Sequence, residues 1–284
     1  MPPEDYEVLK VFNNNVILVM NIDKEKIVIK KGIGFNKIAG SIIAKDTNFE
    51  KVFTIESSEV ASKFNQLVTR VDDSIVGLCE EIISMISSEI KEPLDEGIHI
   101  RLIDHIAFTL HRIKNNDMIT NPFTVEIETL YPKEMEISIK AIAILENSTG
   151  LDIPDDEAGF IALHIHSAKN KGKLSNSIKY AYLCNTLVDF IEDELGIAID
   201  RKSIDYARFI SHIRFALERI IKKIPIKNEL LSSIKRKCTD SYTIAKKVAK
   251  IIEEELTIKV SDEEKGYIAM HIERIRNVSS YTGS

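Results

Sequence analysis

The stretch GFIALHI at residues 159–165 returns 107 positions later as GYIAMHI at residues 266–272. A second stretch, LIDHIAFTLHRI at residues 102–113, returns at the same spacing as FISHIRFALERI at residues 209–220. Two separate blocks that recur at the same spacing of 107 residues indicate that part of the chain is duplicated. A period this long predicts two homologous domains rather than a solenoid, whose repeats span roughly 20–50 residues.

The duplicated region has the periodicity of α-helices. From about residue 59 to residue 276, apolar side chains recur at intervals of three and four, as in Phe64, Leu67 and Val68, which predicts amphipathic helices. Prolines at positions 93, 122, 132, 154 and 225 stand between these stretches, where we expect helices to end. We therefore predict two all-helical bundle domains, residues 65–170 and 174–279, with Ser167–Ser177 as their linker.

The first 57 residues follow a different pattern. Runs rich in Val, Ile and Phe at residues 8–12, 16–21, 26–30 and 51–55 predict a small antiparallel β-sheet. We expect turns at residues 13–15, where three asparagines tolerate φ > 0, and at residues 23–25. Gly32 and Gly34 would allow a partner to approach the backbone closely. A sheet this small buries little core, so we expect this domain, residues 1–57, to be dimeric.

Charge is distributed unevenly along the chain. Residues 8–45 carry seven lysines against one Asp and one Glu, a balance of +5 within a net charge of −6, so the remainder carries −11. Such asymmetry is typical of a nucleic-acid-binding segment attached to an acidic body. A solvated face of a small sheet would show the same balance, so both interpretations stay open at this point.

The composition excludes several classes of protein. No apolar run reaches the roughly 18 residues of a membrane span, and the prolines and acids after Met1 do not form a secretory signal. Cysteines at 79, 184 and 238 are too scattered for a disulfide framework or a zinc ribbon, and they indicate a reducing cytoplasm. Because the sequence contains no P-loop, GxGxxG motif or nucleophile elbow, we predict no cofactor and no catalytic residues.

Four of the seven histidines occupy matching positions, His105 and His164 in the first copy and His212 and His271 in the second. A single histidine on an apolar helix is usually a core residue, and fold constraints alone could retain it. Metal binding lacks converging ligands, since residues 164 and 166 point about 200° apart on a helix. Acid–base catalysis lacks a partner, since the acids 155–157 are better explained as a helix N-terminus. Reversible phosphorylation remains, because neutral imidazole is a competent nucleophile and the added charge would shift a dimer arrangement.

Together these motifs resemble the bacterial transcription antiterminators of the BglG/SacY/LicT type, which the sugar phosphotransferase system controls. The resemblance covers essentially the whole chain. It rests on NNNV at 13–16, GIGF at 32–35 and the histidine motifs DHI, LHI, SHI and MHI. Within the family, DHIAF at 104–108, NPF at 121–123, LYP at 130–132 and ALHIH at 162–166 look most like the glucose-type antiterminator.

The resemblance implies an N-terminal RNA-binding domain, a dimer of four-stranded antiparallel sheets. Such a domain binds an RNA hairpin that overlaps a terminator in the mRNA leader of a sugar-transport operon, and it thereby prevents termination. Carried over by position, the RNA-contacting residues are Lys10, Asn13, Asn15, Lys31, Gly32, Phe35 and Asn36. Lysines would neutralise phosphates and asparagines would read base edges or phosphates. For Phe35, contact with RNA and a place in the core of the sheet both remain open.

The resemblance also implies the protein's partners. The four matched histidines correspond to the family's phosphoacceptors. The cytoplasmic domain of a sugar permease (enzyme II) acts on the first regulation domain, and the phosphocarrier protein HPr acts on the second. The other histidines, His99, His111 and His166, lack equivalents in the second copy and are expected to be surface or packing residues. The implied protein is a cytoplasmic homodimer and not an enzyme.

Two alternatives belong to other classes. The first is a DNA-binding activator with the same regulation domains, which would carry an N-terminal helix-turn-helix. The second is an interaction protein whose matched histidines are purely structural.

Overall fold

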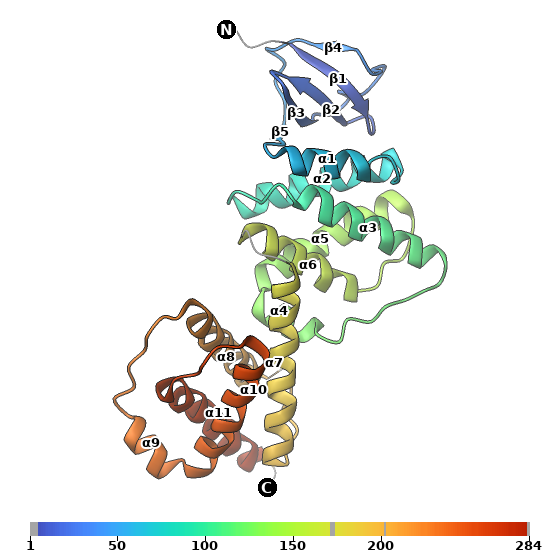
Figure 1. Cartoon of the computed structure of the whole chain (residues 1–284). Coiled ribbons are helices and arrows are strands. Elements are labelled where there is room, and N and C mark those ends of the chain that lie inside the picture. The colour runs from blue at the N-terminus through green and yellow to red at the C-terminus, as the bar shows by residue number, and fades with distance from the viewer. Residues whose placement is uncertain (1–4, 171–173, 202, 283–284) are drawn as a thin grey trace. The chain divides into compact units, whose positions relative to one another are not determined.

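The structure is a computed structural model that describes residues 5–170, 174–201 and 203–282. Within this part of the chain, strands come first and helices follow (Figure 1). The strands are β1 (Tyr6–Val11), β2 (Val16–Asn21), β3 (Lys24–Ile29), β4 (Ile42–Ile43) and β5 (Lys51–Thr54). The helices are α1 (Ser58–Leu67), α2 (Asp73–Ile90), α3 (Ile98–Lys114), α4 (Thr124–Leu130), α5 (Pro132–Thr149), α6 (Asp156–Lys169), α7 (Leu174–Leu195), α8 (Ile204–Lys222), α9 (Leu231–Lys237), α10 (Thr239–Leu256) and α11 (Asp262–Thr282).

The predicted fold class is confirmed, a small antiparallel sheet followed by helices. The strand order is β4-β1-β2-β3-β5, and every neighbouring pair is antiparallel. The sequence analysis missed β4, because two residues are too short to show alternation. The turn expected at residues 23–25 lies one residue earlier, since Ile22 and Asp23 have φ of 48° and 59° and Lys24 already belongs to β3. Positive φ at a β-branched residue such as Ile22 is rare, so sequence reasoning had no signal for it.

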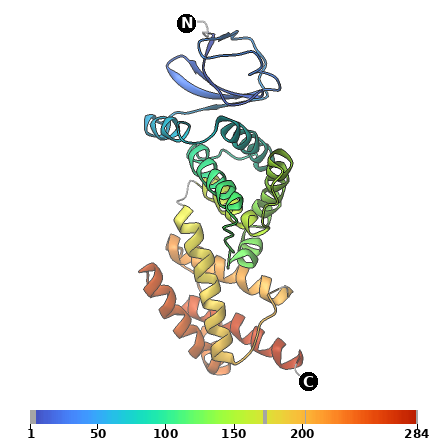
Figure 2. The ribbon, with the colours of Figure 1, turned by 90° about the vertical axis from the view of Figure 1, so that its right-hand side faces the viewer.

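A β-bulge in β1 decides which face of the sheet each residue occupies. Val8 pairs with Val19, but Lys10 pairs with Leu18, so Leu9 is an extra residue in the ladder. The first face holds a core cluster formed by Val8, Ile17, Val19, Val28 and Ile43, with Val11 packed against it. The bulge turns Lys10 to the opposite face, where the ring of Phe12 meets that of Phe64 on α1 at 6.2 Å. In Figures 1 and 2 alike, α1 and α2 lie along the sheet.

This packing bears on the expected dimer. The sheet does not rely on another copy to cover its second face, because α1 and α2 of the same unit cover it. The small core of the sheet is therefore a weaker reason to expect a dimer than the sequence suggested. Dimerisation stays a prediction.

The helical region repeats itself as predicted. Two helix pairs match residue for residue at the spacing of 107, namely α4 with α9 and α5 with α10. Pro132 begins α5 rather than separating helices, which is a favoured position because its missing N–H has no helical partner there. The predicted linker is mostly helical, since α6 continues to Lys169 and α7 begins at Leu174. Residues 171–173 of that linker lie outside the described residues.

The chain divides into two compact units, Met1–Asn121 with Lys133–Leu174, and Pro122–Pro132 with Ser175–Ser284. In the first unit, α3 packs against α1, α2 and α6; in the second, α11 packs against α8, α9 and α10. Helix α4 belongs to the second unit and packs against α8. Among the described helices, none combines the length and the apolar character that crossing a lipid bilayer requires.

Candidate functional site

The first unit brings His105 and His164 together. His105 lies on α3 and His164 on α6, and their ring centroids are 4.9 Å apart with an interplanar angle of 33°. The side chain of His105 is 17% exposed, whereas His164 as a residue is 7% exposed. Residues 59 positions apart in the sequence therefore form one imidazole pair, which the sequence analysis did not predict.

A buried acid lies beside His105. Oε2 of Glu157 is 3.2 Å from Nε2 of His105, and Oε1 accepts a hydrogen bond from Nη2 of Arg112 at 2.7 Å. The hydroxyl of Thr109 donates to Oε2 at 3.0 Å. Burial alone would raise the pKa of the Glu157 carboxyl, but His105 and Arg112 outweigh burial and lower it. Glu157 is thus a buried anion, balanced by Arg112 and facing the imidazole.

The environment of His164 keeps its ring neutral. Burial, followed by the charges of His105 and Arg101, lowers the pKa of His164 to about 3. Its Nδ1 is buried and has no hydrogen-bond partner among the described residues. A neutral ring with a nitrogen lone pair is the nucleophilic form of histidine.

The second unit repeats this arrangement with differences. The rings of His212 on α8 and His271 on α11 are stacked, with centroids 3.9 Å apart and an interplanar angle of 16°. Arg219 and Glu264, which match Arg112 and Glu157, form two hydrogen bonds of 2.7 Å. His212 is exposed. Burial, then the charges of His212 and nearby arginines, lowers the pKa of His271 to about 4.

A cavity opens beside the second pair. It has a volume of about 340 Å³, and both His212 and His271 line it together with Arg219 and Tyr267. The second pair can therefore be reached from solvent more easily than the nearly buried first pair.

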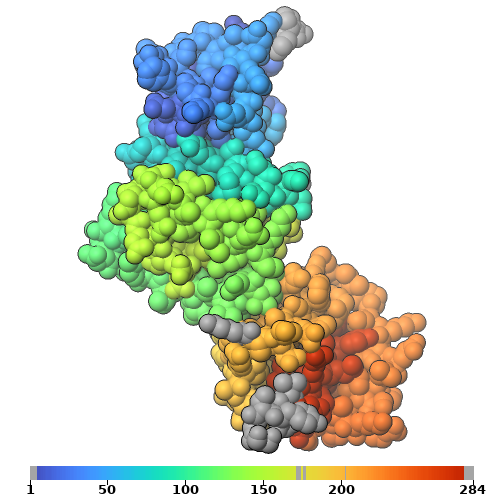
Figure 3. All heavy atoms as spheres, turned by 180° about the vertical axis from the view of Figure 1, so that it is seen from behind, coloured from blue at the N-terminus to red at the C-terminus, as the bar shows by residue number. Residues whose placement is uncertain are grey.

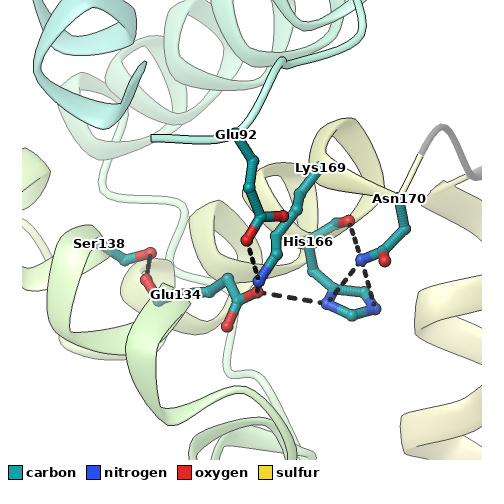
Figure 4. A network of polar contacts seen from close by, with 6 residues as sticks. All are labelled: Glu92, Glu134, Ser138, His166, Lys169 and Asn170. Atoms are coloured by element: carbon teal, nitrogen blue, oxygen red, sulfur yellow. Dashed lines mark hydrogen bonds and ion pairs between the residues drawn. The ribbon is translucent and has the colours of Figure 1, made fainter. Parts of the chain in front are cut away.

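The three unmatched histidines are surface or packing residues, as expected. His99 is buried, and its Nδ1 is 2.8 Å from Oε2 of Glu80. His111 is exposed, and its backbone carbonyl accepts a hydrogen bond from the side chain of Asn115. His166 lies in a network of polar contacts with Glu134 and Asn170 (Figure 4). There its Nδ1 is 3.5 Å from Oε1 of Glu134, whose carboxylate also faces Lys169.

Among the described residues, no group of three or more His, Cys, Asp or Glu side chains is arranged to hold a metal ion.

The asparagine turn of the sheet domain differs from its prediction. None of residues 13–15 has positive φ. The turn is instead held by Oδ1 of Asn13, which accepts hydrogen bonds from the backbone N–H groups of Asn15 and Val16 at 2.8 Å each. Oδ1 of Asn15 in turn accepts from the N–H of Gly32 at 3.0 Å, and so joins the two expected RNA-contacting loops.

The glycine loop has a conformational reason for one glycine and a packing reason for the other, and a partner's approach at Gly32 stays a prediction. Gly32 has φ of +75°, which explains the need for glycine, and a Cβ there would meet open space. At Gly34, a Cβ would lie 2.2 Å from the backbone oxygen of Asn13, so the close approach is to the chain's own turn and not to a partner. Phe35 is 64% exposed and is therefore not a core residue. Lys31 and Asn36 are exposed beside it.

Lys10, Asn13 and Asn15 instead contact α2 and the turn before it. Nζ of Lys10 is 2.8 Å from Oδ1 of Asp73, and the side-chain amides of Asn13 and Asn15 both donate to Glu81. The structure therefore places the seven predicted residues on strand β1 (Lys10) and on two connected loops (the other six), with four exposed to solvent and three against α2.

Sequence reasoning missed the buried ion pairs. The acids 155–157 do form the first turn of a helix, but Glu157 is also 2% exposed and paired with Arg112. The signal was present, since Arg112 and Glu157 both have identical equivalents, Arg219 and Glu264, at the spacing of 107.

Comparison with known protein families matches the whole architecture. The CAT RNA binding domain matches residues 6–62, and the PRD domain matches twice, at residues 80–168 and 185–275. A crystal structure described as GlcT CAT-PRDI aligns with 37% identity and a TM-score of 0.51, covering 58% of this chain and 99% of that one.

Two relatives match over nearly their full length. Protein GlcT of Staphylococcus saprophyticus is 33% identical over 270 residues, 94% of this chain and 96% of the relative. The transcription antiterminator LicT of Bacillus subtilis is 32% identical over 273 residues, 95% and 98% of the two chains. The chain therefore belongs to the BglG-type family of transcription antiterminators, with a CAT RNA binding domain and two PRD domains, and it is of the glucose type.

Proposed function

We propose that this chain is an RNA-binding antiterminator whose activity is set by phosphorylation of His105, His164, His212 and His271. The observation that carries the proposal is the paired geometry, in which each repeat brings two imidazoles together, tilted in the first and stacked in the second, near a matched Arg–Glu ion pair.

The chemistry of the sites supports phosphoryl transfer. The lowered pKa values of His164 and His271 keep both rings neutral at pH 7. An unprotonated ring nitrogen attacks the phosphorus of a donor phosphohistidine or phosphocysteine, the donor's P–N or P–S bond breaks, and the other ring nitrogen releases its proton. The product adds about 1.5 to 2 negative charges. Beside Glu157 or Glu264 this charge repels the carboxylate and competes for the arginine, which favours a rearrangement of the helices.

The two histidine pairs differ in how easily a phosphoryl donor can reach them. His212 is exposed and His271 borders a cavity, whereas the first pair is nearly closed. We assign the phosphocarrier protein HPr to the second regulation domain and the cytoplasmic domain of a sugar permease (enzyme II), with glucose as its sugar, to the first. The phosphorylated groups then bias the arrangement of a cytoplasmic homodimer.

Labelled phosphoenolpyruvate, enzyme I and HPr, with and without the enzyme II domain, test the acceptor assignment. We expect acid-labile label on the wild type and a loss of label at each matched histidine replaced by Ala. His111→Ala is the control, because His111 is exposed and unmatched. A wild-type chain that takes up no acid-labile label, or a His105→Ala variant that is still regulated by the permease, would contradict the proposal.

A second experiment tests the RNA. Hairpins enriched by the full chain from a randomised-loop library provide a probe, hereafter the selected hairpin, and an unselected hairpin is the reference. Lys31→Ala should weaken binding of the selected hairpin and reduce the salt dependence by about one phosphate contact. An affinity unchanged at fixed salt would count against the interface.

The DNA-binding alternative is not favoured. The described residues between 6 and 54 form strands, where a helix-turn-helix would need helices. The relative LicT is named a transcription antiterminator, and this supports a regulatory role for the chain.

A further inference from the structure

Helix α2 and the turn before it occupy part of the proposed RNA interface. Nζ of Lys10 donates to the backbone oxygen of Val68 at 2.9 Å and lies 2.8 Å from Oδ1 of Asp73. Oε1 of Glu81 accepts from Nδ2 of Asn13 at 2.9 Å and from Nδ2 of Asn15 at 3.2 Å. The surface formed by Asp73, Gly77 and Glu81 is called the α2 cover below.

The contact is too close to admit another molecule. A Cβ built on Gly77 would lie 2.5 Å from Nδ2 of Asn13, and its nearest neighbours are all atoms of that one side chain. Glycine in the middle of a helix costs about 0.5–1 kcal/mol relative to alanine. Its presence at position 77 is explained by the approach of Asn13. Figure 3 shows the sheet domain (blue) and the start of the helical region (teal) in continuous contact.

The α2 cover offers the same chemistry as an RNA backbone. Carboxylate oxygens accept charge-assisted hydrogen bonds from lysine and amide donors much as phosphate oxygens do. The donors that would bind phosphates or base edges are therefore already satisfied by Asp73 and Glu81. Phe35 and Lys31 remain in solvent, so only half of the interface is covered.

The second repeat provides an internal comparison. The helix segment LCEEII at residues 78–83 aligns with LCNTLV at residues 183–188, in agreement with PRD matches that begin at residues 80 and 185. In this alignment, the α2 cover is replaced by Ile178, Tyr182 and Thr186. The acidic, glycine-containing surface is therefore particular to the repeat that follows the sheet, and the helical fold does not require it.

We propose that the α2 cover is an intramolecular competitor of RNA, which holds Lys10, Asn13 and Asn15 in a closed state, so that the hairpin binds fully only after the sheet separates from α2. The inference rests on the proposed RNA-binding function. It assigns α2 a direct role, because the helix competes with the hairpin for the same donors. The apparent affinity is then reduced by the fraction of molecules that are closed.

Three full-length variants test the α2 cover. The double variant Asp73→Asn with Glu81→Gln removes both charges, and Gly77→Ala pushes Asn13 away while improving helix propensity. Glu89→Gln is the control, because Glu89 lies on the same helix but pairs with Lys140. Acetylation of Lys10 by a limiting acylating reagent, read by mass spectrometry without RNA, reports opening. We expect faster labelling in both test variants and no change in the control.

Affinity for the selected hairpin decides the proposal. Both test variants should bind it at least tenfold more tightly than the wild type, equivalent to about 1.4 kcal/mol. Faster labelling with unchanged affinity, or no change in either measurement, would overturn the inference while leaving the RNA function intact. If no chain prefers the selected hairpin over the unselected one, and Lys31→Ala has no effect, the proposed function itself fails and the inference falls with it.

Discussion

Glu157→Gln perturbs the most deeply buried charge of the first histidine site. The side chain of Glu157 is 2% exposed, and the side chain of its partner Arg112 is 5% exposed. Gln keeps the shape and part of the hydrogen bonding but leaves the guanidinium without a counter-charge. Removing one partner of a buried ion pair costs about 3–5 kcal/mol. We expect a loss of this size in the free energy of opening of α6.

The second repeat supplies the matched control, Glu264→Gln. The Arg219 side chain is 27% exposed, so water compensates part of its charge once the partner is gone. We expect a cost of about 1–2 kcal/mol there. The two substitutions are chemically identical, and the main difference between the sites is the exposure of the arginine, so the comparison tests the effect of desolvation.

Hydrogen exchange read by mass spectrometry measures α6 and α11 separately in one chain. Because the pKa of Glu157 is lowered in the folded state, its stabilisation is present above its ordinary value of 4.5 and is lost as the pH falls through the lower folded value. The difference between the wild type and Glu157→Gln should therefore shrink below pH 4.5. Equal costs in the two repeats, or a cost under about 1 kcal/mol for Glu157→Gln, would refute the reasoning.

Two further predictions concern stability. The folded-state pKa of His164 is about 3 against an ordinary 6.5, so between these values the unfolded chain binds a proton that the folded chain does not. Stability should fall as the pH drops through this window, and His164→Gln should flatten that part of the slope in urea titrations at several pH values; an unchanged slope would contradict the buried neutral ring. Ile22 has φ of 48° and is 59% exposed, so Ile22→Asn should stabilise the hairpin by about 0.5–1 kcal/mol in thermal unfolding followed by circular dichroism; a lower melting temperature would show that the Ile22 side chain contributes more than its backbone costs.

Much of the architecture could be predicted because duplication makes patterns comparable within one chain. The spacing of 107 aligned His105 with His212 and His164 with His271 in the sequence. In the structure, the two histidines within each copy contact each other. Apolar periodicity was enough for the long helices. Short apolar runs bounded by turn residues were enough for β2 and β3, which are largely buried on both faces.

The parts that could not be predicted depend on three-dimensional partners. The hydrogen-bonding role of Asn13 replaced the expected positive φ, because its side chain satisfies the turn without it. The pairing of Lys10 with Asp73 joins residues 63 positions apart, and no local pattern reports such a contact. The prediction for Gly34 was wrong for the same reason. Its backbone approaches the turn at Asn13, which is 21 positions away in the sequence, and not a partner.

The extra residue in β1 has a consequence for how this strand tolerates changes in length. Tyr6, Val8 and Val11 share one face although the last two are three positions apart, which the bulge at Leu9 alone permits. Deleting Leu9 would restore simple alternation and leave Val8 and Val11 on their side and Lys10 on the other. Deleting Glu7 would instead send Tyr6 to the wrong side, away from the ring of Phe49 that it meets at 5.1 Å. The bulge therefore gives the strand a place, between Val8 and Val11, where a residue can be lost without moving either valine off its face, and loss of Leu9 there also keeps the lysine that faces α2.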